Sequence, residues 1–244
     1  MERTVEPEWL DALPAGDPAA IGSRRDLRRL NACMDSARVL ARALRSVRTE
    51  VKPVHLIELG AGDGDLLLKV ARQLGNSWRG TEATLVDTQD LLGADTSQGF
   101  REVGWKVSEL KSDVFEWSRK ASTGSREIVG ANLFLHHFNS SELEQLLSAI
   151  KRRSMFFVAA EPRRSLLGLV FSRLVGFIGC NAVTRHDAPA SVCAGFAGRE
   201  LSAIWGYDGD WQLSERRSGL FGHLFVARKR DSDGGAERHA VKSM

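Results

Sequence analysis

Cysteine is scarce in this chain and forms no motif. The 244 residues include three cysteines, Cys33, Cys180 and Cys193, which lie far apart in the sequence. Disulfide frameworks and cysteine-ligated zinc sites need several cysteines, usually with pairs at short spacings such as Cys-x-x-Cys, and the sequence contains no such pair. We therefore expect reduced thiols, no disulfide framework and no metal site.

Long apolar runs and a strong excess of one charge are also missing. The run 165–184 is the nearest candidate for a membrane span, but Arg173 interrupts it, and a spanning helix needs ~18–20 apolar residues. The first residues carry Glu2, Glu6 and Glu8 and lack the basic-then-apolar pattern of a signal peptide. The net charge of +3 is too balanced to indicate a nucleic-acid partner. These absences predict a cytoplasmic protein without a transmembrane segment.

Strand-like and helix-like segments alternate through the middle of the chain, which is long enough for one sizeable core. Such alternation is typical of a doubly wound, mostly parallel α/β sheet. Seven strands are expected, at 54–59, 83–86, 106–110, 128–135, 155–160, 211–215 and 221–228. Helices are expected at 65–74, at 96–103, and from a capping box at Asn139 to Ile150.

The segments on either side of this alternation divide the chain further. Residues 1–22 hold three of the six prolines and are expected to be irregular. An amphipathic helix with an Arg-rich face should follow from Ser23 to Val47. The basic face has two interpretations: a solvated surface, or a surface that covers a cofactor or binds an acidic surface. We expect an N-terminal helical cap at 1–50.

An insert and a tail complete the predicted organisation. Residues 163–206 interrupt the α/β rhythm after the fifth expected strand and are predicted to form a substrate lid. Its expected parts are an apolar helix, a polar-studded loop and a short helix, at 166–178, 181–198 and 199–205. The core domain should therefore span 51–228, and the polar tail at 229–244 should be disordered.

The most informative motif is a glycine-rich loop after the first expected strand. The strand ends near Glu58, and glycines follow at alternate positions, at Gly60, Gly62 and Gly64. Glycine allows sharp turns and close approach of a ligand to the backbone. The spacing differs from the Gly-x-Gly-x-x-Gly of dinucleotide folds, and no Gly-Lys-Ser/Thr follows. Because acids surround the loop, it favours a cationic ligand at the carboxyl edge of the sheet.

This loop resembles motif I of the class I S-adenosylmethionine-dependent methyltransferases. The resemblance covers about residues 50–228 and implies a Rossmann-like, seven-stranded sheet whose last strand is antiparallel. It also implies S-adenosylmethionine as the cofactor, with its methionine portion held by the loop residues Glu58, Gly60, Ala61, Gly62 and Gly64.

Residues after the next strands complete the cofactor site that the resemblance implies. Asp87 resembles the motif II acid, whose carboxylate accepts the ribose hydroxyls, and Thr88 follows it. The alternative for Asp87 is a helix N-cap. Asp113 and Val114 resemble the adenine-binding motif, with a surface acid as the alternative for Asp113. Asn132 resembles the polar residue of motif IV, although the family often has Asp earlier, where Glu127 stands in this sequence.

Three histidines are candidate catalytic residues. His136 and His137 stand in Leu-His-His-Phe at the end of the fourth expected strand, a run frequent in small-molecule members of the superfamily, including quinone-type methyltransferases. His186 lies beside Asp187 in the insert. An imidazole can act as a general base near neutral pH. The alternative is that His136 and His137 hold their loop through hydrogen bonds to the backbone.

Four further residues are expected to contact the acceptor substrate: Glu161, Arg163, Arg185 and Asp187. Arg163 and the adjacent Arg164 would bind an anionic group or begin the insert with exposed charge. Glu-Pro-Arg-Arg-Ser at 161–165, Thr-Arg-His-Asp at 184–187 and Ala-Gly-Phe at 194–196 resemble bacterial methyltransferases encoded beside type III polyketide synthases. Those enzymes modify phenolic lipids or related aromatic products.

The resemblance implies S-adenosylmethionine-dependent O- or C-methylation of a small aromatic, phenolic-lipid or polyketide acceptor, as in secondary metabolism. The Asn/Asp-Pro-Pro-aromatic motif of amino-methylating nucleic-acid enzymes is absent. A non-catalytic module that binds S-adenosylmethionine and a partner protein is an alternative. A nicotinamide dehydrogenase is a second one, disfavoured by the glycine spacing. The sequence leaves the oligomeric state open.

Overall fold

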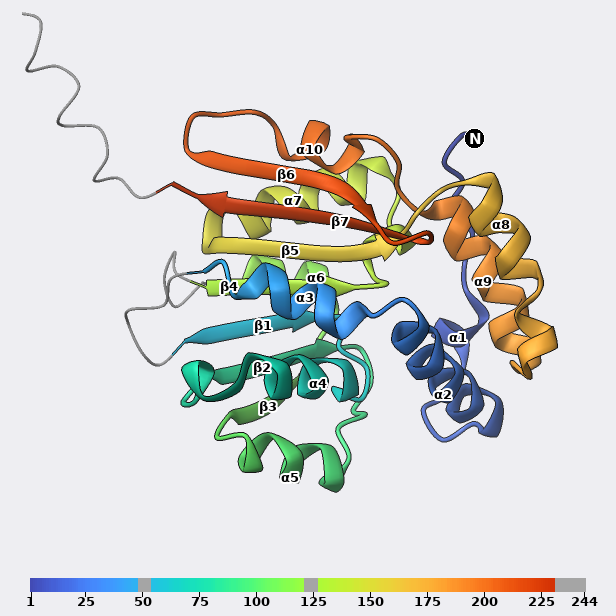
Figure 1. Cartoon of the computed structure of the whole chain (residues 1–244), viewed down its shortest axis with the longest axis horizontal. Helices are drawn as coiled ribbons and strands as arrows, with labels where there is room; N and C mark the ends of the chain where they lie inside the picture. The colour runs from blue at the N-terminus through green and yellow to red at the C-terminus, as the bar shows by residue number, and fades with distance from the viewer. Residues whose placement is uncertain (48–53, 121–126, 231–244) are drawn as a thin grey trace, which may run out of the picture.

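The structure, a computed structural model, describes residues 1–47, 54–120 and 127–230. A seven-stranded sheet runs through its centre in the order β3-β2-β1-β4-β5-β7-β6 (Figure 1). The first five strands pair in parallel, and β7 is antiparallel to both β5 and β6. The predicted doubly wound sheet with an antiparallel last strand is therefore confirmed. The strands are β1 (His55–Leu59), β2 (Glu82–Asp87), β3 (Lys106–Lys111), β4 (Glu127–Asn132), β5 (Ser154–Pro162), β6 (Trp211–Ser218) and β7 (Gly222–Lys229).

Helices cover both faces of the sheet and bury its apolar side chains. One face carries α3 (Ser36–Leu44), α4 (Asp65–Leu74), the short 3-10 helix η1 (Gly75–Trp78) and α5 (Ala94–Glu102). The other face carries α6 (Val114–Arg119), α7 (Ser140–Arg153) and α10 (Glu200–Trp205). The predicted capping box begins α7, since Asn139 accepts from the backbone N–H of Glu142 and the Glu142 side chain accepts in return. Strand β5 is buried along almost its whole length, as expected for a central strand.

The N-terminal region differs from its prediction. Residues 1–22 are not wholly irregular, because α1 (Trp9–Ala12) and the start of α2 (Pro18–Cys33) lie within them. Pro18 begins α2 behind the cap residue Asp17, and proline is favoured at a first helical position. The long helix expected from Ser23 is broken at Asp35, whose φ of 53° is left-handed. The domain boundary expected at 50–51 lies outside the described residues.

Two other predictions are wrong, one at the end of the fourth strand and one in the insert. The fourth strand ends at Asn132, not at 135, because Leu133 has a φ of 50° and the 3-10 helix η2 (Leu135–His137) follows. The loop expected at 181–198 is mostly the helix α9 (Ala182–Ala194), which Asn181 caps by accepting from the backbone N–H of Thr184. The sequence did not predict this helix, because Pro189 lies inside it and its amphipathic pattern is weak.

A helical roof covers the carboxyl ends of the parallel strands. It consists of α1, α2, α8 (Leu166–Arg173), the 3-10 helix η3 (Val175–Ile178) and α9 (Figure 1). Polar contacts join α2 to the start of α9. The hydroxyl oxygens of Ser23 and Thr184 are 3.0 Å apart, and Asp26 accepts a hydrogen bond from the backbone N–H of Asn181 at 2.8 Å. The N-terminal cap and the insert therefore form one unit.

The remaining fold predictions concern membrane spans and the tail. Among the described residues, no helix is both long enough and apolar enough to cross a bilayer. The predicted tail, 229–244, was placed one residue too early, because Lys229 still belongs to β7. Residues 231–244 lie outside the described part of the chain.

Candidate functional site

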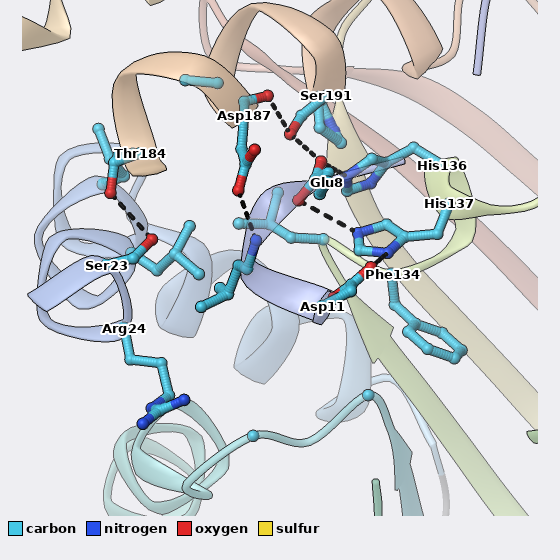
Figure 2. A pocket seen from close by; sticks show the side chains of 18 of the residues that line it. Glu8, Asp11, Ser23, Arg24, Phe134, His136, His137, Thr184, Asp187 and Ser191 are labelled. Carbon is cyan, nitrogen blue, oxygen red and sulfur yellow. Dashed lines mark hydrogen bonds and ion pairs between the residues drawn. The ribbon is translucent and has the colours of Figure 1, made fainter. Parts of the chain in front are cut away.

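A cavity of about 1240 Å³ lies between the carboxyl edge of the sheet and the helical roof. Its floor is formed by the residues after β1, β2, β3 and β4, and its walls by α1, α2, α8 and α9 (Figure 2). A second cavity of about 130 Å³ adjoins it and shares Arg24, Leu27, Gly60, Gly62 and Leu133 with its wall. The two cavities meet at the glycine loop.

The glycine loop is held open by its own backbone geometry and by Asp87. Gly60 and Gly62 have φ values of 63° and 55°, a left-handed conformation that favours glycine. A Cβ at Gly60 would lie 2.2 Å from the Phe134 ring, so the ring packs directly on the loop. Asp87 accepts from the backbone N–H of Gly62 at 2.9 Å and of Gln89 at 3.0 Å. This carboxylate therefore ties the end of β2 to the loop.

The small cavity is lined by two buried acceptors that have no protein donor. Glu58 Oε2 and Asn132 Oδ1 are both buried and unpartnered within the described part of the chain. The amide nitrogen of Asn132 donates to Asn31 Oδ1 of α2 at 3.1 Å, which fixes the side chain. Buried polar atoms are rarely left without a partner. Two such atoms beside one small cavity can accept hydrogen bonds from a group that enters from outside the protein.

The electrostatics of this cavity favour a cation. Burial, followed by repulsion from Asp63 and Asp87, raises the pKa of Glu58 to about 8. A positively charged group in the cavity would offset both effects and let Glu58 ionise. Asp63 also pairs with Arg28 of α2 at 2.6 Å, an ion pair whose members are partly exposed.

Basic residues of α2 face the same cavity from above. Arg24 and Arg28 both line it, and Arg24 also lines the large cavity (Figure 2). A guanidinium donates to carboxylates in a fixed fork geometry. The small cavity thus offers acceptors for an ammonium on its floor and donors for a carboxylate on its roof. Two residues of the Arg-rich helix, Arg24 and Arg28, therefore border the small cavity.

Asp113 and Val114 lie on the wall of the large cavity, beside Phe115. One carboxylate oxygen of Asp113 accepts from the backbone N–H groups of Phe115 and Glu116, at 2.8 and 3.3 Å, and so caps α6. Val114 is buried. The capping role does not remove Asp113 from the site, because these contacts use a single oxygen.

His136 is fixed between two carboxylates. Its Nδ1 lies 2.8 Å from Glu161 Oε2 and its Nε2 lies 3.2 Å from Glu8 Oε1. Burial lowers its pKa, but the hydrogen bonds with Glu161 and Glu8 outweigh burial and raise it to about 9. Burial raises the pKa of Glu8, but its contacts with His136, His137 and Ser191 outweigh burial and lower this pKa to about 2. In the ligand-free protein His136 is therefore a buried cation, not a neutral base.

Glu161 organises the loop after β4. Besides His136, it accepts from the backbone N–H groups of Phe134 and Leu135, at 3.1 and 2.9 Å. Its side chain is buried and does not line either cavity. The structure places this residue behind the site, so direct contact with an acceptor is not supported.

His137 is the more accessible of the two adjacent histidines. Its Nδ1 lies 2.9 Å from Asp11 Oδ2, and its Nε2 lies 3.6 Å from Glu8 Oε2. Figure 2 shows the Glu8 carboxylate facing both imidazole rings from one side, on the cavity wall. Two of these four groups, Glu8 and Asp11, lie at α1, and the other two lie in η2, which is distant in the chain.

The insert motif Thr-Arg-His-Asp serves mainly to hold α1. Asp187 accepts from the backbone N–H groups of Trp9 and Leu10, at 2.9 and 3.1 Å, and so caps α1 from another element. The His186 ring stacks on Trp9 with the ring centroids 3.8 Å apart, and its Nδ1 lies 2.8 Å from Asp187. Asp187 lines the large cavity and His186 does not.

The predicted site residues fall into two groups. Those that line a cavity are Glu58, Gly60, Ala61, Gly62, Asp87, Thr88, Asp113, Val114, Asn132, His136, His137 and Asp187. Those that line neither cavity are Gly64, Glu161, Arg163, His186 and Arg185. Gly64 begins α4 instead, where a Cβ would lie 2.8 Å from Leu85. Arg163 is a backbone partner of Phe196 and Phe221, and Arg185 is exposed beside Gly176.

Sequence reasoning missed several residues that line the large cavity: Glu8, Asp11, Ser191, Phe134, Phe171 and Phe177. Glu8 and Asp11 are three residues apart, which is one turn of a helix, but the prolines around them favoured an irregular lead-in. No local signal in the first twelve residues indicates that α1 would pack against η2 and α9.

The comparisons with known proteins agree on the fold. No protein-family model matches the chain, and no curated protein matches its sequence. The solved plantazolicin methyltransferase BpumL, in complex with SAH, is similar with a TM-score of 0.61 and 11% identity, over 88% of this chain and 92% of that one. An O-methyltransferase family protein from Burkholderia thailandensis has a TM-score of 0.52 and 14% identity, over 90% of this chain and 65% of that one.

A third similar structure is the CurJ carbon methyltransferase, with a TM-score of 0.50 and 18% identity, over 81% of this chain and 54% of that one. The chain thus spans about half to two thirds of the last two proteins and most of the first. Identities this low establish the fold alone. The chain has the Rossmann-like methyltransferase fold, with its cavities at the edge where that fold binds ligands.

Proposed function

We propose that the chain is an S-adenosylmethionine-dependent methyltransferase that acts on a small, lipophilic aromatic acceptor. One observation carries the cofactor assignment: two orphaned acceptors, Glu58 Oε2 and Asn132 Oδ1, border a small cavity under a left-handed glycine loop. An ammonium is the donor that such a pair accommodates. The methionine portion of S-adenosylmethionine carries an ammonium and a carboxylate on adjacent atoms.

The surrounding residues fit the rest of the cofactor. Arg24 and Arg28 face the small cavity and would bind the carboxylate. Asp87 lies at the end of β2 on the wall of the large cavity, where its carboxylate would accept from ribose hydroxyls. Val114 and Phe115 would flank an adenine ring, and Asp113 has a carboxylate oxygen available for the exocyclic amine.

The acceptor would occupy the rest of the large cavity, whose outer wall is apolar. Phe171, Leu174, Phe177 and Ile178 of α8 and η3 line it and are largely exposed. Phe134 and Phe138 lie on the inner wall and pack edge to face, with centroids 5.1 Å apart. Apolar walls with a small polar cluster are typical of sites for lipophilic small molecules. A phenolic lipid or aromatic polyketide product matches this lining.

When bound, S-adenosylmethionine would supply an electrophilic methyl group, and the protein would supply position and charge. Glu58, Asp87 and the glycine loop would hold the cofactor, and His136 and His137 lie on the wall of the adjoining large cavity. In-line methyl transfer depends chiefly on placing acceptor and methyl in contact. His137, partly exposed on that wall, is the protein group best placed to accept a proton from an acceptor hydroxyl.

Replacement of Asp87 by alanine tests the cofactor assignment. Loss of charge-assisted hydrogen bonds to the ribose should weaken S-adenosylhomocysteine binding by ~1.5–3 kcal/mol, measured by calorimetry. The control is Asp95→Ala, an acid in the first turn of α5 that does not line the cavities. Equal affinity of the Asp87 variant and the wild type would exclude Asp87 from the site.

A methyl-transfer assay with labelled S-adenosylmethionine and a panel of phenols with alkyl chains of increasing length tests the acceptor class. We expect kcat/KM to increase with chain length. Cofactor binding with no turnover on any phenol, enol or carbon acceptor would favour the non-catalytic binding module.

A further inference from the structure

Both imidazoles of the His136–His137 pair direct their Nε2 atoms at one carboxylate. His136 Nε2 lies 3.2 Å from Glu8 Oε1, and His137 Nε2 lies 3.6 Å from Glu8 Oε2. One donor atom from each of the three residues can be chosen so that all lie within 4.8 Å of one another. Donor atoms around a tetrahedral zinc, bound at ~2.0–2.2 Å, are themselves about 3.3–3.5 Å apart. The separations at Glu8 match that spacing.

The other nitrogen of each ring is held by a second carboxylate. Glu161 Oε2 lies 2.8 Å from His136 Nδ1, and Asp11 Oδ2 lies 2.9 Å from His137 Nδ1. A histidine that binds a metal through Nε2 usually donates its Nδ1–H to a carboxylate or carbonyl, which fixes the ring and its tautomer. Both histidines have this arrangement, and both lie on the wall of the large cavity.

The cluster also has an excess of negative groups. Three carboxylates, from Glu8, Asp11 and Glu161, surround two imidazoles. Arg3 lies beside this cluster but donates to the carbonyl oxygens of His136 and Phe138, not to the carboxylates. A dication between the Nε2 atoms and Glu8 would displace the Nε2 proton of His136 to solvent. It would reduce the charge excess and join α1 to η2.

We propose that Glu8, His136 and His137 form a binding site for one divalent transition-metal ion on the wall of the large cavity. Two imidazoles and one carboxylate suit Zn²⁺, Mn²⁺, Co²⁺ or Fe²⁺ and are a poor set for Mg²⁺ or Ca²⁺, which prefer oxygen ligands. Three protein ligands leave a position open toward the cavity, as in catalytic metal sites.

The role of this ion rests on the proposed function. An acceptor hydroxyl or phenol in the open position would lose its proton more readily, since a bound metal stabilises the oxyanion. Because a metal-bound His137 has no nitrogen free to act as the base, the proton would leave to solvent in this case. The oxyanion would attack the methyl carbon of the sulfonium as the carbon–sulfur bond breaks. The class of acceptor this favours is an oxygen nucleophile, which indicates O-methylation.

The test is calorimetric titration of chelator-treated protein with ZnCl₂, together with the visible spectrum of the Co²⁺ form. We expect one equivalent to bind with micromolar or higher affinity, and a spectrum of four- or five-coordinate Co²⁺. Glu8→Gln and His137→Ala should each weaken Zn²⁺ binding at least tenfold, and Asp11→Asn, which removes a support of His137, should weaken it about tenfold.

His55→Ala is the matched control, because His55 also faces a carboxylate, Glu82, at 3.6 Å but lies away from both cavities. This variant should bind Zn²⁺ like the wild type. No stoichiometric binding by the wild-type protein would overturn the proposal, as would binding that Glu8→Gln and His137→Ala leave unchanged. The cluster would then be an ion-pair network that attaches α1.

Two readouts separate this proposal from the proposed function. S-adenosylhomocysteine titration of the same variants should give wild-type affinity. None of the three ligands lines the small cavity, and none is among the residues assigned to the ribose or the adenine. A wild type that binds Zn²⁺ but not S-adenosylhomocysteine would support the metal site and contradict the cofactor assignment. Thermal unfolding of Glu8→Gln shows whether this variant is folded. His137→Ala is a second test that should disturb the fold less, because the His137 side chain is partly exposed.

Discussion

Glu58 shows how a single residue links burial, charge and ligand choice. Its carboxyl is buried at the end of β1, and one of its oxygens has no hydrogen-bond donor among the described residues. With a pKa raised to about 8 by burial and by its acidic neighbours, it is mostly protonated near pH 7 in the ligand-free protein. An ammonium in the cavity would reverse that preference.

Cofactor binding should therefore release a proton from Glu58. Below pH 8 the free carboxyl holds its proton, and binding of the ammonium requires the carboxylate, so affinity should increase as pH rises from 6 to 8, by up to about tenfold per unit. Calorimetry in buffers of different ionisation enthalpy measures the release. Glu58→Gln should abolish it and weaken binding. An affinity of the wild type that does not change over this range would contradict the assignment.

At the residue scale, the sequence predicted the cavity-lining residues at the strand ends better than those of the helical roof. Glu58, Asp87 and Asn132 were identified because each lies near the carboxyl end of a strand whose pattern is strong, and these strand ends meet at one edge. Glu161, predicted to contact the acceptor, and His186, predicted as a catalytic base, lie outside the cavities, because their contacts depend on packing between distant elements. Spacing along the chain carries no information on such contacts.

At the scale of elements, α1 is small but central to the cavity. It has four residues, and none is buried. Its attachment comes from the Asp187 cap, from the Trp9–His186 stack and from the Glu8 contacts with the histidines. A helix this short has little stability of its own. Contacts with α9 and η2 therefore decide whether the cavity wall forms.

Asp187→Ala should detach α1. The variant loses an acceptor for two backbone N–H groups, and the free energy of unfolding should fall by ~0.5–2 kcal/mol, as for other lost caps. Trypsin should cleave within the first 25 residues faster than in the wild type. Asn139→Ala, which removes the cap of α7, should cost similar stability without that cleavage. Equal cleavage rates in both variants would show that Asp187 does not attach α1.

The sequence predicted most elements of the sheet and few of the roof. Helix α4 was predicted at its observed bounds, because a regular apolar face ends at a glycine. Helix α9 was expected as a loop, since Pro189 and small residues hide its period. Its helicity comes from the Asn181 cap and from packing against α1 and α2, which local propensity does not encode.

At the scale of the whole molecule, an apolar surface continues from the cavity rim. Exposed large apolar side chains of α8 and η3 form it, at Leu166, Leu167, Val170, Phe171, Leu174, Phe177 and Ile178. Phe171 also packs against Phe221 next to the β6–β7 turn, with centroids 5.2 Å apart. Extended apolar surface beside a cavity often marks a binding site. The apolar surface and the cavity therefore belong to the same functional region.

Phe177→Asp tests that connection. The side chain is 88% exposed, so thermal stability and S-adenosylhomocysteine affinity should not change. The KM for a long-chain phenol should rise about tenfold, the effect of losing part of an apolar contact, with a smaller rise for phenol itself. Tyr207→Asp, at a site that is 67% exposed and does not line the cavities, is the control. Equal KM values for Phe177→Asp and the wild type would exclude the rim from acceptor binding.

The central claim is that the paired cavities at the glycine loop bind S-adenosylmethionine. Calorimetric titration with S-adenosylhomocysteine, with NADH as the control, tests it most directly. We predict one equivalent of S-adenosylhomocysteine bound at micromolar affinity, with release of a proton at pH 7, and no binding of NADH. Failure to bind S-adenosylhomocysteine, or binding of NADH in its place, would contradict the account.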